Sequence, residues 1–228
     1  MSNDLATSRR AAIDAFLEQN RQRLAAADGR GRLIFALDAT LSRQPTWDIA
    51  CRLQADMFRE AATIGGLDMQ LVYYRGMSEC RASRWLSDGR SLAEVMGKIS
   101  CRGGQTQIGK VLAHAQRESE RQQLQAIVFV GDHMEERVDN LCAIASELGL
   151  RGIPVFLFQE NSDPAATSAF AEIARLSNGA HCRFDPGAAR ELAELLRAVA
   201  AYAAGGRDAL LANKTAAAAK LLLQLPPR

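Results

Sequence analysis

Residues 32–42 read RLIFALDATLS, and this stretch decides the fold that we expect for the chain. RLIFAL is a short, unbroken apolar run, which is typical of a strand buried on both faces in a parallel sheet. The run ends at Asp38, and hydroxyl side chains follow at Thr40 and Ser42. Alternate side chains of extended backbone project the same way, so we expect these three side chains to converge on one point.

The rest of the chain alternates between apolar runs and amphipathic segments. Strands are expected at 69–74, 79–86, 125–130, 153–158 and 181–184, and helices at 8–27, 47–62, 91–99, 108–122, 135–148, 164–176 and 186–204. This alternation predicts an α/β fold with a doubly wound, mostly parallel, Rossmann-like sheet and helices on both faces. We expect an N-terminal helical extension at 1–30, one α/β domain at 31–204 and a C-terminal helical tail at 205–228.

The composition excludes several classes of protein. The chain has 228 residues, of which 48% are hydrophobic and 24% charged, so wholesale disorder is excluded. A formal net charge of +2 makes no platform for a nucleic-acid backbone. No stretch approaches the roughly 20 apolar residues that cross a bilayer. The N-terminus has no apolar signal core and the five cysteines form no CxxC motif, so we expect a cytoplasmic protein with free thiols.

Two further segments add oxygen side chains at the same edge of the expected sheet. GGQT at 103–106 places Thr106 in a flexible loop ahead of a helix, and Asp132 follows the strand expected at 125–130. Two carboxylates and three hydroxyls, without histidine or thiol, suit Mg²⁺ or Mn²⁺ rather than zinc. The alternative is that these residues only cap helices or form turns.

The three segments DATLS, GGQT and VFVGD together resemble the metal-ion-dependent adhesion site of von Willebrand factor type A domains. That pattern is DxSxS after the first strand, a threonine in a glycine-rich loop and an aspartate after the fourth strand. The resemblance covers about 32–202 and implies a metal site formed by Asp38, Thr40, Ser42, Thr106 and Asp132.

The chain departs from this pattern at two positions. Thr40 stands where serine is usual, and its methyl group constrains the rotamer. His133 follows Asp132 where glycine is common, which brings a titratable group to the rim of the site. We expect the partner-binding rim to consist of Gln105, His133 and Glu135.

The resemblance implies a non-catalytic, divalent-metal-dependent protein–protein interaction module of an intracellular assembly. A partner's Asp or Glu would complete the Mg²⁺ shell, and such assemblies often contain AAA+ ATPases. One alternative is a Mg²⁺-dependent hydrolase or phosphotransfer enzyme that uses the same site, with His133 or a glutamate as the base. The other is an interaction domain with a degenerate, metal-free site.

Competing nucleotide and phosphate motifs fail in their chemistry. GQTQIGKV at 104–111 nearly spells a P-loop, but Val111 replaces the hydroxyl that holds Mg²⁺. Asp38 after a strand also fits an aspartyl phosphohydrolase, but Thr40 cannot act there as the general acid or base.

The remaining polar residues that stand out are expected to be structural. His114 lies inside a helix and His181 opens an edge strand. Glu135 and Glu136 are expected to favour the dipole of the helix at 135–148.

The tail at 208–228 reads DALLANKTAAAAKLLLQLPPR, which is rich in helix formers. Leu211, Ala218, Leu222 and Leu225 would share a stripe along one helix. The stripe either packs on its own domain or mediates self-association or partner binding. We expect residues 208–225 to serve association more than folding.

Overall fold

The computed structural model describes residues 30–185 and 188–227, so the helix expected at 8–27 lies outside the described residues. Six strands form one sheet in the order β3-β2-β1-β4-β5-β6. They are β1 (Gly31–Asp38), β2 (Leu67–Arg75), β3 (Glu79–Ala82), β4 (Ala126–Gly131), β5 (Val155–Glu160) and β6 (Ala180–Phe184). Neighbouring strands are parallel except for β2 and β3, which form an antiparallel hairpin at one edge.

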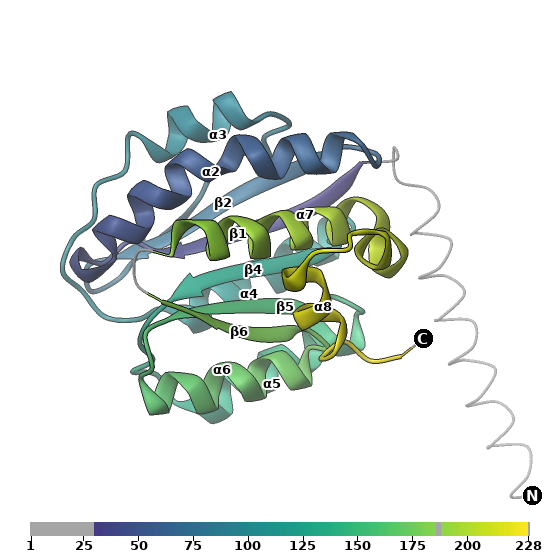
Figure 1. The fold of residues 1–228 in the computed structure, drawn as a ribbon. Helices are drawn as coiled ribbons and strands as arrows, with labels where there is room; N and C mark the ends of the chain where they lie inside the picture. The colour runs from purple at the N-terminus through teal and green to yellow at the C-terminus, as the bar shows by residue number, and fades with distance from the viewer. Residues whose placement is uncertain (1–29, 186–187, 228) are drawn as a thin grey trace, which may run out of the picture.

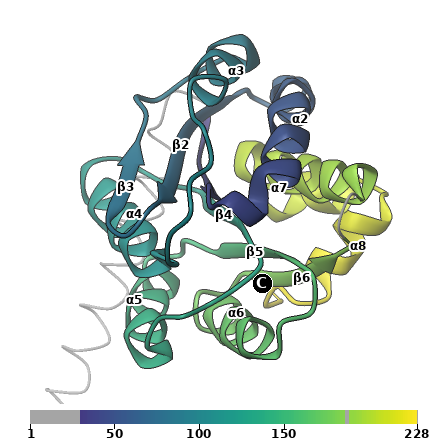
Figure 2. The same cartoon turned by 90° about the vertical axis from the view of Figure 1, so that its left-hand side faces the viewer.

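Helices cover both faces of this sheet (Figures 1 and 2). On one face pack α2 (Gln44–Ala62), α3 (Gly89–Met96), α7 (Ala189–Ala212) and α8 (Ala216–Leu222), and on the other α4 (Ile108–Arg121), α5 (Val138–Leu150) and α6 (Pro164–Leu176). A single 3₁₀ turn, η1 (Leu41–Arg43), follows β1. The doubly wound α/β fold expected from the sequence is therefore confirmed. No helix of the described segments is long and apolar enough to span a membrane.

The two faces explain the unbroken apolar run in β1. Leu33, Phe35 and Leu37 point into the core beneath α2 and α7. Ile34 and Ala36 point into the core beneath α4, α5 and α6. Each of these side chains is at most 1% exposed, so no position between Arg32 and Asp38 is left for a polar residue.

Several expected boundaries were wrong. β3 ends at Ala82 instead of continuing to 86, because Leu86 makes only an isolated bridge to Met69. α5 begins at Val138 rather than at 135, and the residues before it form a loop. The helix end expected at 204 is confirmed, because Gly205 and Gly206 have non-helical backbone angles, with a φ of 68° at Gly206; a second helical segment after this kink completes α7 to Ala212.

The C-terminal segment packs on its own domain. Leu210, Ala218 and Leu221 are fully buried in the core that contains β1, whereas Leu211 of the expected stripe is 54% exposed. Gln224 also forms two hydrogen bonds with the backbone of His181 in β6, at 2.9 and 3.0 Å. Residues 208–225 therefore contribute to the folded domain more than the sequence suggested, and their role in association stays a prediction.

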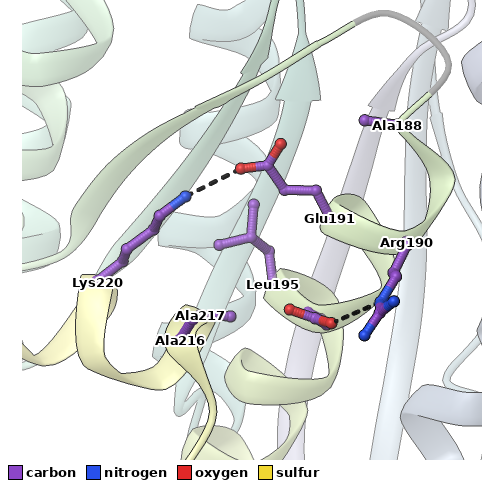
Figure 3. A pocket seen from close by; sticks show the side chains of 8 residues that line it. Ala188, Arg190, Glu191, Leu195, Ala216, Ala217 and Lys220 are labelled. Carbon is purple, nitrogen blue, oxygen red and sulfur yellow. Dashed lines mark hydrogen bonds and ion pairs between the residues drawn. The ribbon is translucent and has the colours of Figure 1, made fainter.

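A pocket lies where α8 meets the first turns of α7 (Figure 3). Lys220 of α8 bridges it, because its ammonium group pairs with Glu191 at 3.0 Å. Arg190 pairs with Glu194 at 3.2 Å along the same wall. The first contact ties α8 to α7, and the two together leave the pocket without an unpaired charge among its lining residues.

Candidate metal centre

Asp38 and Asp132 lie at the carboxyl ends of two neighbouring strands, β1 and β4. The strands pair in parallel, with Leu37 opposite Val130, so the two aspartates emerge side by side. The chain runs from β1 outward to β2 on one side and returns to β4 on the other, which makes this the switch point of the sheet. Both side chains are buried, at 3% and 4% exposure.

The loop after β1 gathers three of the expected oxygen side chains. The carboxylate of Asp38 accepts a hydrogen bond from the backbone N–H of Thr40 at 2.7 Å. The chain then enters η1, and the hydroxyls of Thr40 and Ser42 lie 3.2 Å apart in a hydrogen bond. Ser42 is exposed, whereas Asp38 is buried below it, so the cluster opens toward the surface.

The glycine-rich loop lies against this first loop. The N–H of Arg102 donates to the carbonyl of Ala39 at 3.0 Å. On its other side, a Cβ on Gly104 would meet the carbonyl oxygen of Gly76 at 2.2 Å. Glycine at 104 therefore allows the loop to pack on the β2–β3 turn and to keep its place beside Asp38.

Thr106 is clamped to the loop that follows β4. Its N–H donates to the carboxylate of Glu135, and its hydroxyl accepts from the N–H of Glu135, both at 3.0 Å. Glu136 accepts from the N–H groups of Ile108 and Gly109 at 2.5 and 2.9 Å. The two glutamates therefore serve the N-terminus of α4, not that of the helix in which the sequence placed them.

Arg43 is a residue of the site that the sequence reasoning missed. Its guanidinium is 2% exposed, pairs with the carboxylate of Glu160 at the end of β5, and lies 3.9 Å from Asp132. The hydroxyl of Thr46 donates to the same Glu160 oxygen at 2.5 Å. Two guanidinium nitrogens, Nε and Nη2, have no hydrogen-bond partner within the described part of the chain. An arginine directly after DATLS carries no sequence signal for burial.

The charges of this cluster do not balance. Three buried carboxylates, Asp38, Asp132 and Glu160, face one buried guanidinium, which leaves two formal negative charges in excess. Burial raises the pKa of Asp38, and Asp132 adds to that rise, while hydrogen bonds from Thr40 and the charge of Arg43 oppose it. A divalent cation has the charge that this cluster lacks.

A buried phenol closes the floor of the site. Tyr74 lies opposite Asp38 in the register of β1 and β2 and stacks on Phe129. Burial raises the pKa of Tyr74 well above its ordinary value, and the neighbouring Asp38 raises it further. Tyr74 therefore stays protonated and adds no charge to the site.

The three expected rim residues differ in the contacts that their side chains make. Gln105 is exposed, and its N–H bonds to the carbonyl of Gly76 at 3.2 Å. The His133 side chain is 60% exposed and lies 3.7 Å from the carboxylate of Asp163, which caps α6. The carboxylate of Glu135 is held by Thr106. All three residues of the expected rim are exposed, but only Gln105 and His133 have side chains that are not held by the loop of Thr106.

The oxygen side chains of the candidate site suit a hard cation that is bound mainly by hydroxyl groups, not one that is enclosed by carboxylates. Within residues 30–185 and 188–227, no group of three or more His, Cys, Asp or Glu side chains is placed to hold a metal. A site built on Asp38 and Asp132 therefore needs the oxygens of Thr40, Ser42 and Thr106, together with water.

Comparison with known proteins identifies the fold. No protein-family model and no curated protein sequence matches this chain. A solved von Willebrand factor type A structure from Catenulispora acidiphila matches with a TM-score of 0.59 and 17% identity, over 77% of this chain and 43% of that one. The SpRpn10 VWA domain matches with a TM-score of 0.57 and 15% identity, over 78% and 97%.

Two further structures share the fold. An aerotolerance-related membrane protein from Bacteroides fragilis NCTC 9343 matches with a TM-score of 0.57 and 19% identity, over 73% of this chain and 96% of that one. Proximal thread matrix protein 1 from the mussel byssus, with a zinc-occupied MIDAS motif, matches with a TM-score of 0.57 and 15% identity, over 77% and 46%. The chain therefore has the fold of a von Willebrand factor type A domain.

Proposed function

We propose that this chain is a non-catalytic protein-binding module whose ligand completes a divalent metal site. The observation that carries the proposal is the excess of two negative charges buried where β1 and β4 end. Mg²⁺ is the proposed cation, with Mn²⁺ as the alternative. Asp38 and Asp132 would supply its charge, and Thr40, Ser42 and Thr106 would supply neutral oxygens.

The neutral donors determine what such a site would recognise. When bound, the cation would supply an electrophilic open position to a ligand oxygen. Because three of the five protein donors are uncharged, a partner's Asp or Glu would gain more there than at a fully neutralised ion. The exposed Ser42, Gln105 and His133 would meet the rest of the partner's surface.

The contacts of the candidate bases favour binding over hydrolysis. A hydrolase at this site would need a free base, and the sequence offered His133 or a glutamate. The carboxylates of Glu135 and Glu136 are occupied by backbone N–H groups of the loop before α4 and of its first turn. His133 lies beside Asp163 rather than beside Asp38. These contacts support a binding module.

Cysteine chemistry supports a reducing, cytoplasmic location for this module. All five cysteines are free, and burial raises the pKa of both Cys51 and Cys101 to about 11, which keeps these thiols protonated.

The sequence resemblance adds an AAA+ ATPase assembly as the kind of partner to test first. Self-association remains a prediction from the sequence, and measuring the mass in solution would test it.

The proposal is tested by partner capture with the full chain, in Mg²⁺ and in chelator. Ser42→Ala is the informative variant, because the Ser42 side chain is exposed and makes one hydrogen bond, to Thr40. Ser162→Ala, in the exposed loop after β5, is the matched control. We expect capture by wild type and by the control in Mg²⁺ only, and weak capture by Ser42→Ala. Equal recovery under all conditions would refute metal-dependent binding.

A further inference from the structure

The outer edge of β3 presents unpaired backbone groups. In an antiparallel pair, successive residues point their N–H and C=O groups alternately toward the partner strand and away from it. The N–H of Ser83 donates to the carbonyl of Leu71 in β2, so the alternation turns the backbone of Cys80 and Ala82 outward. Within the described residues these outward groups form no hydrogen bond, and Figure 2 shows β3 at the margin of the sheet.

A basic groove runs beside this edge, between β3 and α4. Its volume is about 200 Å³. We call it the edge groove; its lining residues are Val72, Cys80, Arg81, Ala82, Lys110, Ala113, His114 and Arg117. Lys110, His114 and Arg117 follow one another along α4 at helical spacing. The lining contains three cationic side chains, those of Arg81, Lys110 and Arg117, and no carboxylate.

The positive charge of the edge groove is only partly compensated within the described structure. Arg81 pairs with Glu79 at 3.3 Å, whereas Lys110 and Arg117 have no carboxylate partner there. Arg117 is exposed and forms no ion pair there. The ammonium group of Lys110 donates to two neutral oxygens, the carbonyl of Ser78 and the side chain of Gln107, at 2.9 and 2.8 Å. The nearest glutamates already have partners, since Glu79 pairs with Arg75 and Glu118 with Arg121.

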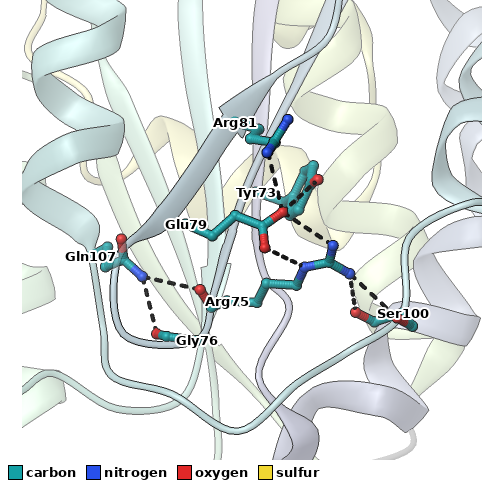
Figure 4. A network of polar contacts seen from close by, with 7 residues as sticks. All are labelled: Tyr73, Arg75, Gly76, Glu79, Arg81, Ser100 and Gln107. Carbon is teal, nitrogen blue, oxygen red and sulfur yellow. Dashed lines mark hydrogen bonds and ion pairs between the residues drawn. The ribbon is translucent and has the colours of Figure 1, made fainter.

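A polar network holds the β2–β3 hairpin in place (Figure 4). Arg75 donates two hydrogen bonds to Glu79, at 3.0 and 3.1 Å, and one to the carbonyl of Ser100 at 2.6 Å. The side chain of Gln107 donates to the carbonyl of Gly76 at the turn, at 3.2 Å. The edge is therefore preformed, and a ligand would not have to order it.

We propose that the edge groove binds an acidic segment of a partner protein in extended conformation. The segment would pair as an added strand with the backbone of Cys80 and Ala82. Alternate side chains of an added strand face α4, where carboxylates would meet Lys110 and Arg117. A small anion would use the cationic charge but not the strand edge.

The test measures binding of a fluorescent octapeptide of alternating Glu and Val to the full chain by anisotropy. A Lys–Val octapeptide is the control ligand, and chelator in every sample removes any contribution from the metal site. Lys110→Gln/Arg117→Gln should weaken binding of the acidic peptide about threefold to tenfold, the combined size of two exposed ion pairs. Arg52→Gln/Arg90→Gln removes the same charge from the opposite face of the sheet and should leave binding unchanged.

Ala82→Pro tests the strand edge separately, because proline removes an N–H that points away from β2 and is tolerated at sheet edges. We expect weaker peptide binding at an unchanged far-ultraviolet spectrum. Equal binding of both peptides, or no binding, would overturn the proposal, as would equal loss in the two charge variants. Full affinity in a folded Ala82→Pro, with competition by inorganic phosphate, would reduce the site to a small-anion site and also overturn it.

Discussion

Arg43 and Glu160 form the buried pair on which the candidate site rests at the scale of single residues. Removing one partner of a buried ion pair leaves an uncompensated charge, which costs about 3–5 kcal/mol. We therefore expect Arg43→Met and Glu160→Gln each to lower the free energy of unfolding by about that amount in metal-free urea titrations. The double variant removes both charges, so it should lose less than the sum of the single losses. Strictly additive losses would show that the two side chains are not coupled.

The same residues mark the limit of what the sequence could predict about the site. Asp38 and Asp132 were placed correctly at neighbouring strand ends, because an apolar run that stops at an aspartate fixes where its strand ends. Arg43 could not be found in this way, since its burial depends on Glu160, which lies more than a hundred residues away. The role of Glu136 was missed for the same reason, because the helix N-terminus that it serves belongs to a different segment.

At the scale of elements, α8 is part of the core. Leu221 is fully buried and Leu223, two residues on, is 87% exposed. Leu221→Ala should lower the free energy of unfolding by about 2–5 kcal/mol, the usual cost of emptying a core leucine site. Leu223→Ala should change it by less than about 0.5 kcal/mol. Thermal or urea unfolding would measure both, and a Leu221→Ala variant as stable as the control would show that α8 is detachable.

The strand and helix order was predictable because the central strands are apolar at every position and the helices between them are amphipathic. The packing of the C-terminal tail was not predictable, because a sequence rich in Ala and Leu is compatible both with a helix packed on the domain and with an exposed helix. Its packing is set by Gln224 on the edge of β6 and by the kink at Gly205 and Gly206, which turns the chain back. Neither the hydrogen bonds of Gln224 nor the direction in which the chain turns at the kink leaves a periodic pattern in the sequence.

At the scale of the whole molecule, two half-buried histidines link stability to pH. Burial lowers the pKa of His114 and of His181 below their ordinary value near 6.5. The unfolded chain therefore binds more protons than the folded one at mildly acid pH, and stability falls as the pH drops below about 6.5. Urea unfolding at pH 7.5 and 5.5 should show this loss.

His114→Gln/His181→Gln is the matching variant for this pH effect. Both positions keep a polar side chain beside Gln70 and Gln159, their hydrogen-bond partners. The difference in unfolding free energy between the two pH values should become smaller in the variant. An unchanged difference would assign the pH dependence to groups other than these two histidines.

The two excess charges at the ends of β1 and β4 are expected to hold a divalent cation. Calorimetric titration with Mg²⁺ and Mn²⁺ tests it most directly, on wild type, Asp38→Asn and the control Asp56→Asn. Asp56 lies on α2, where it pairs with Arg59 away from the cluster. We expect one saturable site in wild type and in the control, and loss of that site in Asp38→Asn. Equal binding by all three proteins, or no binding by wild type, would contradict it.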